Sequence, residues 1–281
     1  MNNYHTHNFV ISIPTAEKRR NHLSRQFQSH HIPFRFFDAF TPSERLTHYL
    51  QQHLPHVLNS PALTMGEKGC LASHFALWKK CIDENLSYIT LFEDDILLGQ
   101  QAAHFLSQDA WLKERFDFNE KFILRLETFL MPVEVENKNE ISPFSQHNFA
   151  LLKSTHFGTA GYIISKAAAS YLIDFFSHLP AEELKPIDEI IFNRLLNMQD
   201  YYVYQLTPAI CVQELQLNQG DSLLNSDLEA ERKRHKYKPK KSLKQRLTRL
   251  KENVIRALNK KKWEEEKRRK ALKGKEIIPF T

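Results

Sequence analysis

Short apolar runs along the chain alternate with longer stretches in which apolar residues recur at helical spacing. Runs of this length, rich in aromatic and β-branched residues, are typical of buried strands. They occupy residues 8–13 (NFVISI), 34–40 (FRFFDAF), 88–95 (YITLFEDD), 121–127 (KFILRLE), 148–153 (NFALLK) and 160–165 (AGYIIS).

The stretches between these runs predict helices. After Gly66 the apolar residues are spaced by four, three and four positions, which places them on one helical face; they are Leu71, Phe75, Trp78 and Ile82. Helices are also expected over residues 15–28, 166–176 and 187–196.

Strands that alternate with helices indicate an α/β layered domain with a mostly parallel central sheet. In an open sheet of this kind, ligands bind outside the carboxyl ends of the strands. Functional side chains are therefore expected where a strand ends.

The composition adds limits. The chain has 281 residues, of which 42% are apolar, enough for a substantial core. No apolar run approaches the roughly 18 residues of a membrane span, and the first residues lack the layout of a signal peptide. Cys70, Cys81 and Cys211 show neither close ligand pairing nor a disulfide framework. We expect a cytoplasmic protein with reduced cysteines and no structural zinc.

Charge divides the chain into two parts. Residues 231–281 contain 21 Lys and Arg against 6 Glu, a net charge of +15, whereas residues 1–230 contain 18 basic and 27 acidic residues, a net charge of −9. This contrast predicts an acidic catalytic domain over residues 1–230 and a basic tail over residues 231–281.

Within the tail, apolar residues recur every three or four positions among lysines and arginines: Leu243, Leu247, Leu250, Val254 and Leu258. This pattern predicts an amphipathic cationic helix. Such a helix can lie on an anionic membrane surface, here the cytoplasmic face of an inner membrane, with about 1 kcal/mol of attraction for each basic residue. Alternatively, its apolar stripe covers the catalytic domain.

Three adjacent carboxylates, Glu93, Asp94 and Asp95, follow the apolar run of residues 88–92. Adjacent carboxylates repel one another, and burying one of them without a partner is costly. They are either solvated at the end of a strand or turned toward a cation in a ligand crevice. The chain has seven glycines and no Gly-x-Gly-x-x-Gly or Walker loop, so a bound phosphate would depend on such a cation.

Four sequence blocks, in order, resemble glycosyltransferase family 25, the lipooligosaccharide galactosyltransferases. The blocks are FVISIPTAEKRR, GEKGCLASHFALWKK, ITLFEDDILL and HFGTAGYIISKAAASYL, and PIDEI follows them. The resemblance covers about residues 8–225, and its most specific parts are the blocks around Ser73–His74 and around Glu93–Asp95.

The resemblance implies a GT-A-like nucleotide-sugar-binding fold, a UDP-sugar donor, a Mn²⁺ or Mg²⁺ ion and inversion at the anomeric carbon. The expected activity is transfer of galactose from UDP-galactose to a lipooligosaccharide or other saccharide acceptor, forming a β-1,4 linkage. A glucosyltransferase of the same family is the alternative, because a choice between two such sugars can rest on one or two pocket contacts.

The resemblance also assigns roles to residues. Glu93 and Asp95 fill the outer positions of an Asp-x-Asp-like motif and are expected to hold the metal, and Asp94 is a further donor-site candidate. Asp188, just after Pro186, would stand in the first turn of a helix and act as the catalytic base, with Glu189 in reserve. Stabilisation of the helix end is the alternative role for Asp188.

Other donor-binding candidates come from the same blocks. His74 is either a donor-site residue or a buried histidine that holds a neighbouring group. Arg20, like its neighbour Arg19, is either a phosphate ligand or part of an exposed helix face. The remaining donor-binding candidates are Ser12 and Ser73 in these blocks and Gln213 in the later segment TPAICVQELQLNQGDS, which resembles the closing segment of the family.

Two rival functions follow from the residues alone. A phosphohydrolase would use the same carboxylates and metal but would release phosphate without an acceptor. A nucleic-acid-binding protein would act through the tail. The acidic domain lacks aromatic residues interleaved with basic ones, so no nucleic acid is expected as the main partner.

Overall fold

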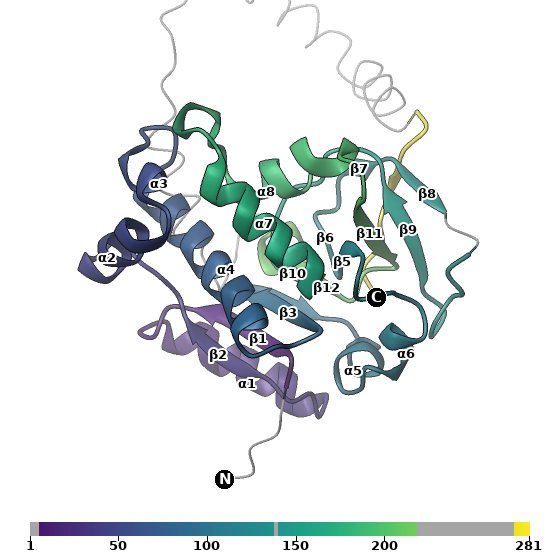
Figure 1. Cartoon of the computed structure of the whole chain (residues 1–281). Coiled ribbons are helices and arrows are strands. Elements are labelled where there is room, and N and C mark those ends of the chain that lie inside the picture. The colour runs from purple at the N-terminus through teal and green to yellow at the C-terminus, as the bar shows by residue number, and fades with distance from the viewer. Residues whose placement is uncertain (1–5, 138–139, 218–272) are drawn as a thin grey trace, which may run out of the picture.

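An eight-stranded sheet forms the centre of the computed structural model, which describes residues 6–137, 140–217 and 273–281 (Figure 1). Its strand order is β2-β1-β3-β10-β5-β11-β9-β8. The strands are β1 (Asn8–Ser12), β2 (Arg35–Asp38), β3 (Tyr88–Glu93), β5 (Lys121–Arg125), β8 (Val135–Asn137), β9 (Asn148–Leu152), β10 (Gly161–Ser165) and β11 (Tyr201–Thr207).

The prediction of a mostly parallel sheet is wrong. Of the seven neighbouring pairs in this described sheet, β1–β2, β1–β3 and β5–β11 are parallel and the other four are antiparallel. The strand β10 lies antiparallel between β3 and β5. An apolar run encodes burial on both faces of a strand but carries no information about its direction.

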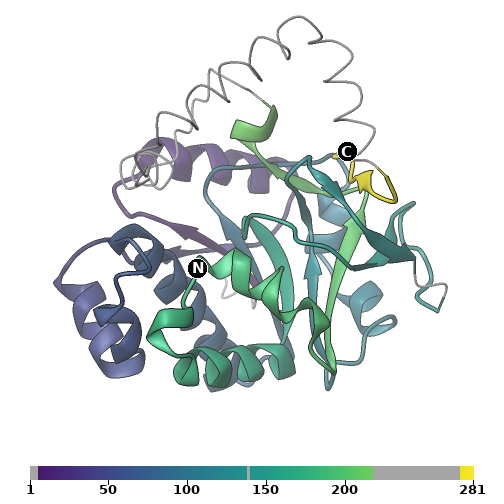
Figure 2. The same ribbon diagram turned by 90° about the horizontal axis from the view of Figure 1, so that it is seen from above.

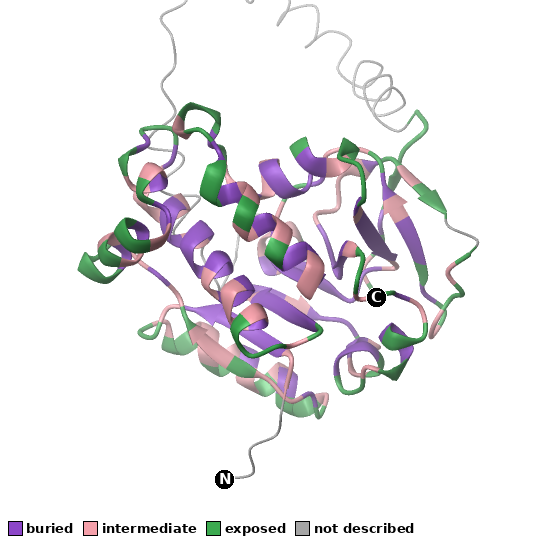
Figure 3. Cartoon of the chain, viewed as in Figure 1, coloured by how far each residue is buried: buried purple, intermediate pink, exposed green. Residues whose placement is uncertain are grey.

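Helices cover both faces of the sheet, so the domain has three layers. On one face α4 (Met65–Asp83) and α7 (Lys166–His178) pack on a core that includes Ile89, Leu91 and Tyr162. On the other face α1 (Glu17–Ser29) packs on a core that includes Val10 and Phe92. Figure 2 shows α1 and α7 on opposite sides of the sheet, and Figure 3 shows its buried strands.

Capping hydrogen bonds explain where α4 and α7 begin. Thr64 and Glu67 form a capping box at the start of α4, and Ser165 accepts a hydrogen bond from the Ala168 N–H at the start of α7. The other helices are short: α2 (Glu44–His53), α3 (Pro55–Asn59), α5 (Ala102–Leu106), α6 (Ala110–Lys113), α8 (Ile187–Ile191) and α9 (Glu214–Leu217), with 3₁₀ turns at Ala181–Glu183 and Arg194–Asn197.

A small second sheet extends the end of β3. Its strands are β4 (Ile96–Leu98), β12 (Cys211–Gln213) and β6 (Glu127–Thr128), with β12 in the middle. The strand β4 follows β3 after the turn at Asp94 and Asp95. This sheet therefore brings residues near position 213 next to the carboxylates that end β3.

The segment of residues 273–281 returns to the domain. Its strand β13 (Glu276–Ile277) pairs with β7 (Pro132–Val133), and the Ile278 side chain is fully buried in the core. The Thr128 hydroxyl donates a hydrogen bond to the Ile278 carbonyl at 2.8 Å. The predicted basic helix around residues 240–259 lies outside the described residues.

Within the described part of the chain, Cys70, Cys81 and Cys211 are all free thiols, as the sequence predicts. The same part holds no helix that is both long enough and apolar enough to span a membrane.

Candidate active site

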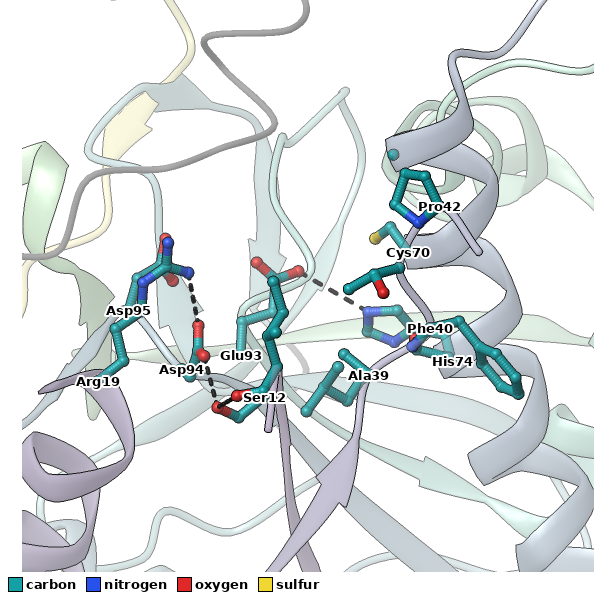
Figure 4. A pocket seen from close by; sticks show the side chains of 15 residues that line it. Ser12, Arg19, Ala39, Phe40, Pro42, Cys70, His74, Glu93, Asp94 and Asp95 are labelled. Carbon is teal, nitrogen blue, oxygen red and sulfur yellow. Dashed lines mark hydrogen bonds and ion pairs between the residues drawn. The ribbon is translucent and has the colours of Figure 1, made fainter. Parts of the chain in front are cut away.

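A pocket of about 250 Å³ opens where β3 ends (Figure 4). Its floor is the carboxylate triplet of Glu93, the last residue of β3, and of Asp94 and Asp95 in the following turn. The end of β1, residues 39–42 after β2, and one side of α4 form its walls. The predicted carboxylates thus lie at the carboxyl end of a central strand and face a crevice.

The middle carboxylate, Asp94, has both oxygens engaged. Ser12 donates a hydrogen bond to its Oδ2 at 2.6 Å, and Arg19 Nη1 lies 3.0 Å from its Oδ1. Asp94 is therefore a charge-paired anchor that holds the end of β1 and the start of α1 against β3.

Asp95 is buried at 9% exposure, and its neighbours are mostly acidic. Burial, followed by the charges of Glu93 and Asp94, raises its pKa to about 7. Gln213 Nε2 lies 3.3 Å from Asp95 Oδ2, which brings this predicted donor-binding residue to the carboxylates. The Glu214 N–H donates to the Asp95 carbonyl, so the small sheet fixes the turn.

Glu93 is held from the opposite side. The Thr159 hydroxyl donates to its Oε1 at 2.6 Å, and His74 Nε2 lies 3.8 Å from the same oxygen. Thr159 belongs to residues 157–160, which lead into β10 and which we call the bridging loop. The Glu93 N–H also donates to the Ala160 carbonyl, so the loop is tied to β3 at two points.

A buried relay of hydrogen bonds determines which ring nitrogen of His74 carries a proton. Trp78 Nε1 donates to the Tyr162 hydroxyl at 3.0 Å, and that hydroxyl lies 2.8 Å from His74 Nδ1. Because the Tyr162 oxygen already accepts from Trp78, its own proton is best placed on His74 Nδ1. From this network we infer that His74 carries its proton on Nε2, facing Glu93 and the pocket.

This tautomer bears on two groups of residues that could hold a cation. Cys70, His74 and Glu93 place their ligand atoms within 4.8 Å of one another, but an Nε2–H group cannot coordinate a metal. Glu93 and Asp95 offer oxygen ligands, which suit Mn²⁺ or Mg²⁺. Burial is the main cause of the raised Asp95 pKa, and the charges of Glu93 and Asp94 add to it; a divalent ion would favour the charged carboxylate, so Glu93 and Asp95 fit the implied metal.

Ser73 and Arg20 serve neighbouring groups. The Ser73 hydroxyl donates to the Gly69 carbonyl and accepts from the Phe40 N–H, which fixes residues 39–42 to α4 as a wall of the pocket. Arg20 contacts Ser12 and Asp38, whereas Arg19 lines the pocket. Arg19 is therefore better placed than Arg20 to meet a phosphate.

Asp188 contacts the backbone of the bridging loop. The N–H of Gly158 donates to its Oδ2 at 3.1 Å, and the N–H of Glu189 donates to its Oδ1 at 3.1 Å. As predicted, Asp188 stands in the first turn of α8 after Pro186. Its carboxylate is half-buried, and it binds Gly158, the residue before the Thr159 that binds Glu93.

A buried ion pair, absent from the sequence-based candidates, supports the bridging loop. Arg125 donates to the carbonyls of Phe157 and Gly158 at 2.8 and 2.9 Å and to Glu127 at 3.0 Å. Both residues are fully buried, and burial raises the pKa of Glu127 to about 8 although the Arg125 charge opposes the rise. The signal for them was the charged pair inside the apolar run KFILRLE, which a strand cannot place at the surface when both faces are covered.

Comparison with known proteins gives consistent matches. The family model described as "Glycosyltransferase family 25 (LPS biosynthesis protein)" matches residues 5–191. Over 296 residues the chain is 50% identical to the lipooligosaccharide biosynthesis protein lex-1 of Haemophilus influenzae, covering 97% of this chain and 98% of that protein. It is 42% identical over 276 residues to the lacto-N-neotetraose biosynthesis glycosyltransferase LgtB of Neisseria meningitidis, covering 97% and 99%. It is also 42% identical over 274 residues to the lipooligosaccharide biosynthesis protein lic2B of H. influenzae, covering 97% and 98%.

Proposed function

The chain belongs to glycosyltransferase family 25, which confirms the resemblance seen in the sequence, and on this premise we propose that it is an inverting, metal-dependent galactosyltransferase of lipooligosaccharide biosynthesis with a GT-A-like fold. It moves galactose from UDP-galactose to a saccharide acceptor and forms a β-1,4 linkage. The observation that carries this proposal is the carboxylate triplet at the end of β3, which lines one pocket together with Arg19.

The walls of this pocket suit the nucleotide part of a donor. Ala39, Phe40 and Pro42 supply an apolar wall for a flat base. Arg19, at the other side of the pocket, is the cation placed to meet a diphosphate. His74, as an Nε2–H donor, faces Oε1 of Glu93 in the same pocket.

Glu93 and Asp95 would hold the Mn²⁺ or Mg²⁺ ion, which would neutralise the diphosphate as UDP leaves. Asp94 would keep its two partners and fix the turn between the other two carboxylates. Gln213 would orient Asp95 through its side-chain amide.

Asp188 takes the acceptor proton in this proposal. The acceptor hydroxyl oxygen attacks the anomeric carbon and forms the new C–O bond, its proton passes to Asp188, and the bond to UDP breaks with its electron pair on the phosphate oxygen. Attack from the face opposite UDP requires the base and the nucleotide on different sides of the sugar. Support comes from the bridging loop, where Gly158 binds Asp188 and the next residue, Thr159, binds Glu93, so the proposed base and a proposed metal ligand are held by adjacent residues.

The decisive experiment measures UDP release and product formation from a panel of UDP-sugars, with lactose- and glucosamine-type acceptors, with Mn²⁺ and with chelator. We expect turnover of UDP-galactose that depends on metal and acceptor. Glu93→Gln with Asp95→Asn should lower it about 100-fold or more, as when a preorganised electrostatic group is removed. Glu114→Gln, an exposed carboxylate, is the matched control.

Three outcomes would count against the proposal. Undiminished turnover in the double variant or with chelator would remove the metal role. Preference for UDP-glucose would replace galactose by the alternative donor. Asp188→Asn should still bind UDP yet lose on the order of 10²–10⁴ in turnover, and near-normal turnover would exclude it as the base.

A further inference from the structure

A second cavity, of about 400 Å³, opens on the Asp188 side of the bridging loop. Its walls come from residues 131 and 132 at the start of β7, from residues 154, 155 and 157 before β10, from Glu189 and Asn193 in and after α8, and from Lys275 just before β13. Figure 1 places α8 and β7 near each other at one end of the sheet. Its volume lies in the lower part of the range of about 300–1,000 Å³ that is usual for small-molecule sites.

One wall of this cavity is an exposed aromatic side chain. Phe157 is 39% exposed and meets Phe129 edge to face, with ring centroids 6.1 Å apart. The N–H of the next residue, Gly158, is held by Asp188, and the Phe157 carbonyl by Arg125, so the backbone that carries this ring is fixed. A rigid exposed aromatic face suits the C–H-rich face of a sugar ring, because the ring face carries partial negative charge.

The remaining walls offer polar groups that converge on the cavity. The Asn193 side-chain oxygen accepts a hydrogen bond from the Thr155 hydroxyl at 2.7 Å, so its NH₂ group is the part that remains to donate. The Ser154 hydroxyl accepts from the Glu134 N–H and can still donate its own proton. With the carboxylate of Glu189, these groups supply the donors and acceptors that sugar hydroxyls need.

The bridging loop connects this cavity to the carboxylates of β3. Phe157 lines the cavity, and Thr159, two residues later, binds Glu93. Two trans peptide units span at most about 7.6 Å between Cα atoms. Asp188, which binds Gly158 between them, is the neighbour of Glu189 in the cavity wall. A ligand in the cavity therefore contacts Phe157 and Glu189, the chain neighbours of Gly158 and Asp188, and lies two residues along the loop from Thr159, which binds Glu93.

We propose that this cavity is the acceptor subsite and binds the terminal pyranose of the saccharide acceptor. The sugar ring lies on Phe157, its hydroxyls bind Asn193 and Glu189, and the reacting hydroxyl points past Gly158 toward Asp188. This inference rests on the proposed transferase function and adds the place and the chemistry of acceptor recognition.

The test is steady-state kinetics with the lactose- or glucosamine-type acceptor that wild type turns over fastest. Phe157→Ala should raise the KM for the acceptor about tenfold, the effect of losing one aromatic contact, and much more than it changes the Kd of UDP. Asn193→Ala should raise the same KM, and Phe157→Tyr, which keeps the ring, should restore it. Met198→Ala removes an apolar side chain that is 49% exposed elsewhere and is the matched control.

The results separate the two proposals. An acceptor KM within twofold of wild type in both Phe157→Ala and Asn193→Ala would overturn the acceptor subsite, even if transfer and metal dependence were found. An equal loss of acceptor and UDP binding would also overturn it, because it would indicate general damage to the loop. Absence of transfer from every UDP-sugar in wild type would instead remove the proposed function.

Discussion

At the scale of single residues, the position of the ring proton of His74 depends on the buried hydroxyl group of Tyr162. Tyr162→Phe removes the proton donor to His74 Nδ1 and the acceptor for Trp78 Nε1. We expect a loss of about 1–3 kcal/mol of stability, the cost of buried polar groups without partners. We also expect the His74 proton to distribute between its two nitrogens, as measured by ¹⁵N chemical shifts of the ring.

Tyr49→Phe is the matched control for this prediction. The Tyr49 hydroxyl is also buried, but it has no hydrogen-bond partner in the part of the chain that the structure describes. Its removal should therefore leave stability unchanged or slightly higher. Equal losses in the two variants would contradict the relay from Trp78 to His74.

Glu127 should make the stability of the protein depend on pH. Burial raises its pKa in the folded state to about 8, whereas an exposed Glu titrates near its ordinary value of about 4.3. The folded protein therefore binds more protons than the unfolded chain between these values, and its stability falls as pH rises through this window. As pH rises through this window, the stability of Glu127→Gln relative to wild type should increase by up to about 1.4 kcal/mol per pH unit.

Urea unfolding at pH 5.5, 6.5, 7.5 and 8.5 measures this difference. Glu114→Gln, at an exposed position, should follow wild type at every pH. Parallel curves for wild type and Glu127→Gln would show that the Glu127 pKa is not raised by burial.

The sequence identified the carboxylate triplet because three adjacent acids after an apolar run are chemically unusual. It did not distinguish Arg19 from Arg20, since neighbouring helical residues point about 100° apart and the exact start of α1 is not encoded locally. It missed the role of Arg125 and Glu127, because their partners lie at residues 157–160, far along the chain.

At the scale of elements, the close packing of α4 against residues 39–42 shapes the donor pocket. A Cβ atom added at Gly69 would lie 2.4 Å from the Phe40 carbonyl oxygen, a backbone atom that cannot move aside by itself. Gly69→Ala should therefore push α4 and this wall apart. We expect a loss of about 1–3 kcal/mol of stability and weaker UDP binding.

Asp83→Ala, at an exposed position near the end of the same helix, is the control and should stay within about 0.5 kcal/mol of wild type. Chemical unfolding and calorimetric titration with UDP measure the two effects. Unchanged UDP binding in Gly69→Ala would show that residues 39–42 do not contact the nucleotide.

Periodicity predicted the helices α1, α4 and α7 and the strands β1, β2, β3, β5, β9 and β10, because burial of one or both faces leaves a repeating apolar pattern. The single helix expected over residues 187–196 is wrong, since α8 ends at Ile191 and a 3₁₀ turn follows at Arg194–Asn197. Periodicity also missed β11, whose sequence YYVYQLT mixes aromatic rings with polar groups. Strand directions were also beyond it, since they depend on which strands meet in the sheet. The apolar pattern thus fixes the layers of this fold but not its sheet topology.

At the scale of the whole molecule, the basic segment of residues 218–272 is attached to the domain on both sides. Its preceding residues belong to α9, next to the carboxylate pocket, and its following residues pair with β7 and place Ile278 in the core. The membrane-binding role predicted for the basic helix within this segment can therefore be tested with both attachments intact.

Substituting Gln for the lysines and arginines of residues 240–262, with residues 273–281 intact, should abolish binding to liposomes that contain anionic lipids. The reason is loss of about 1 kcal/mol of attraction for each basic residue near the surface. Cosedimentation measures the binding, and neutral liposomes are the control. Retained binding to anionic liposomes would assign the membrane contact to another surface.

Truncation is the wrong way to remove this charge. A stop codon anywhere between positions 218 and 277 also deletes Ile278, whose side chain is fully buried in the core. Loss of such a side chain leaves a cavity and typically lowers stability by about 2–5 kcal/mol. The shortened protein would also expose the edge of β7 that β13 now covers. An unpaired strand edge can pair with another chain and so promotes aggregation. Poor yield or aggregation of such a fragment would indicate a damaged core. Failure of the fragment to sediment with lipid would therefore not show that the basic residues bind the membrane.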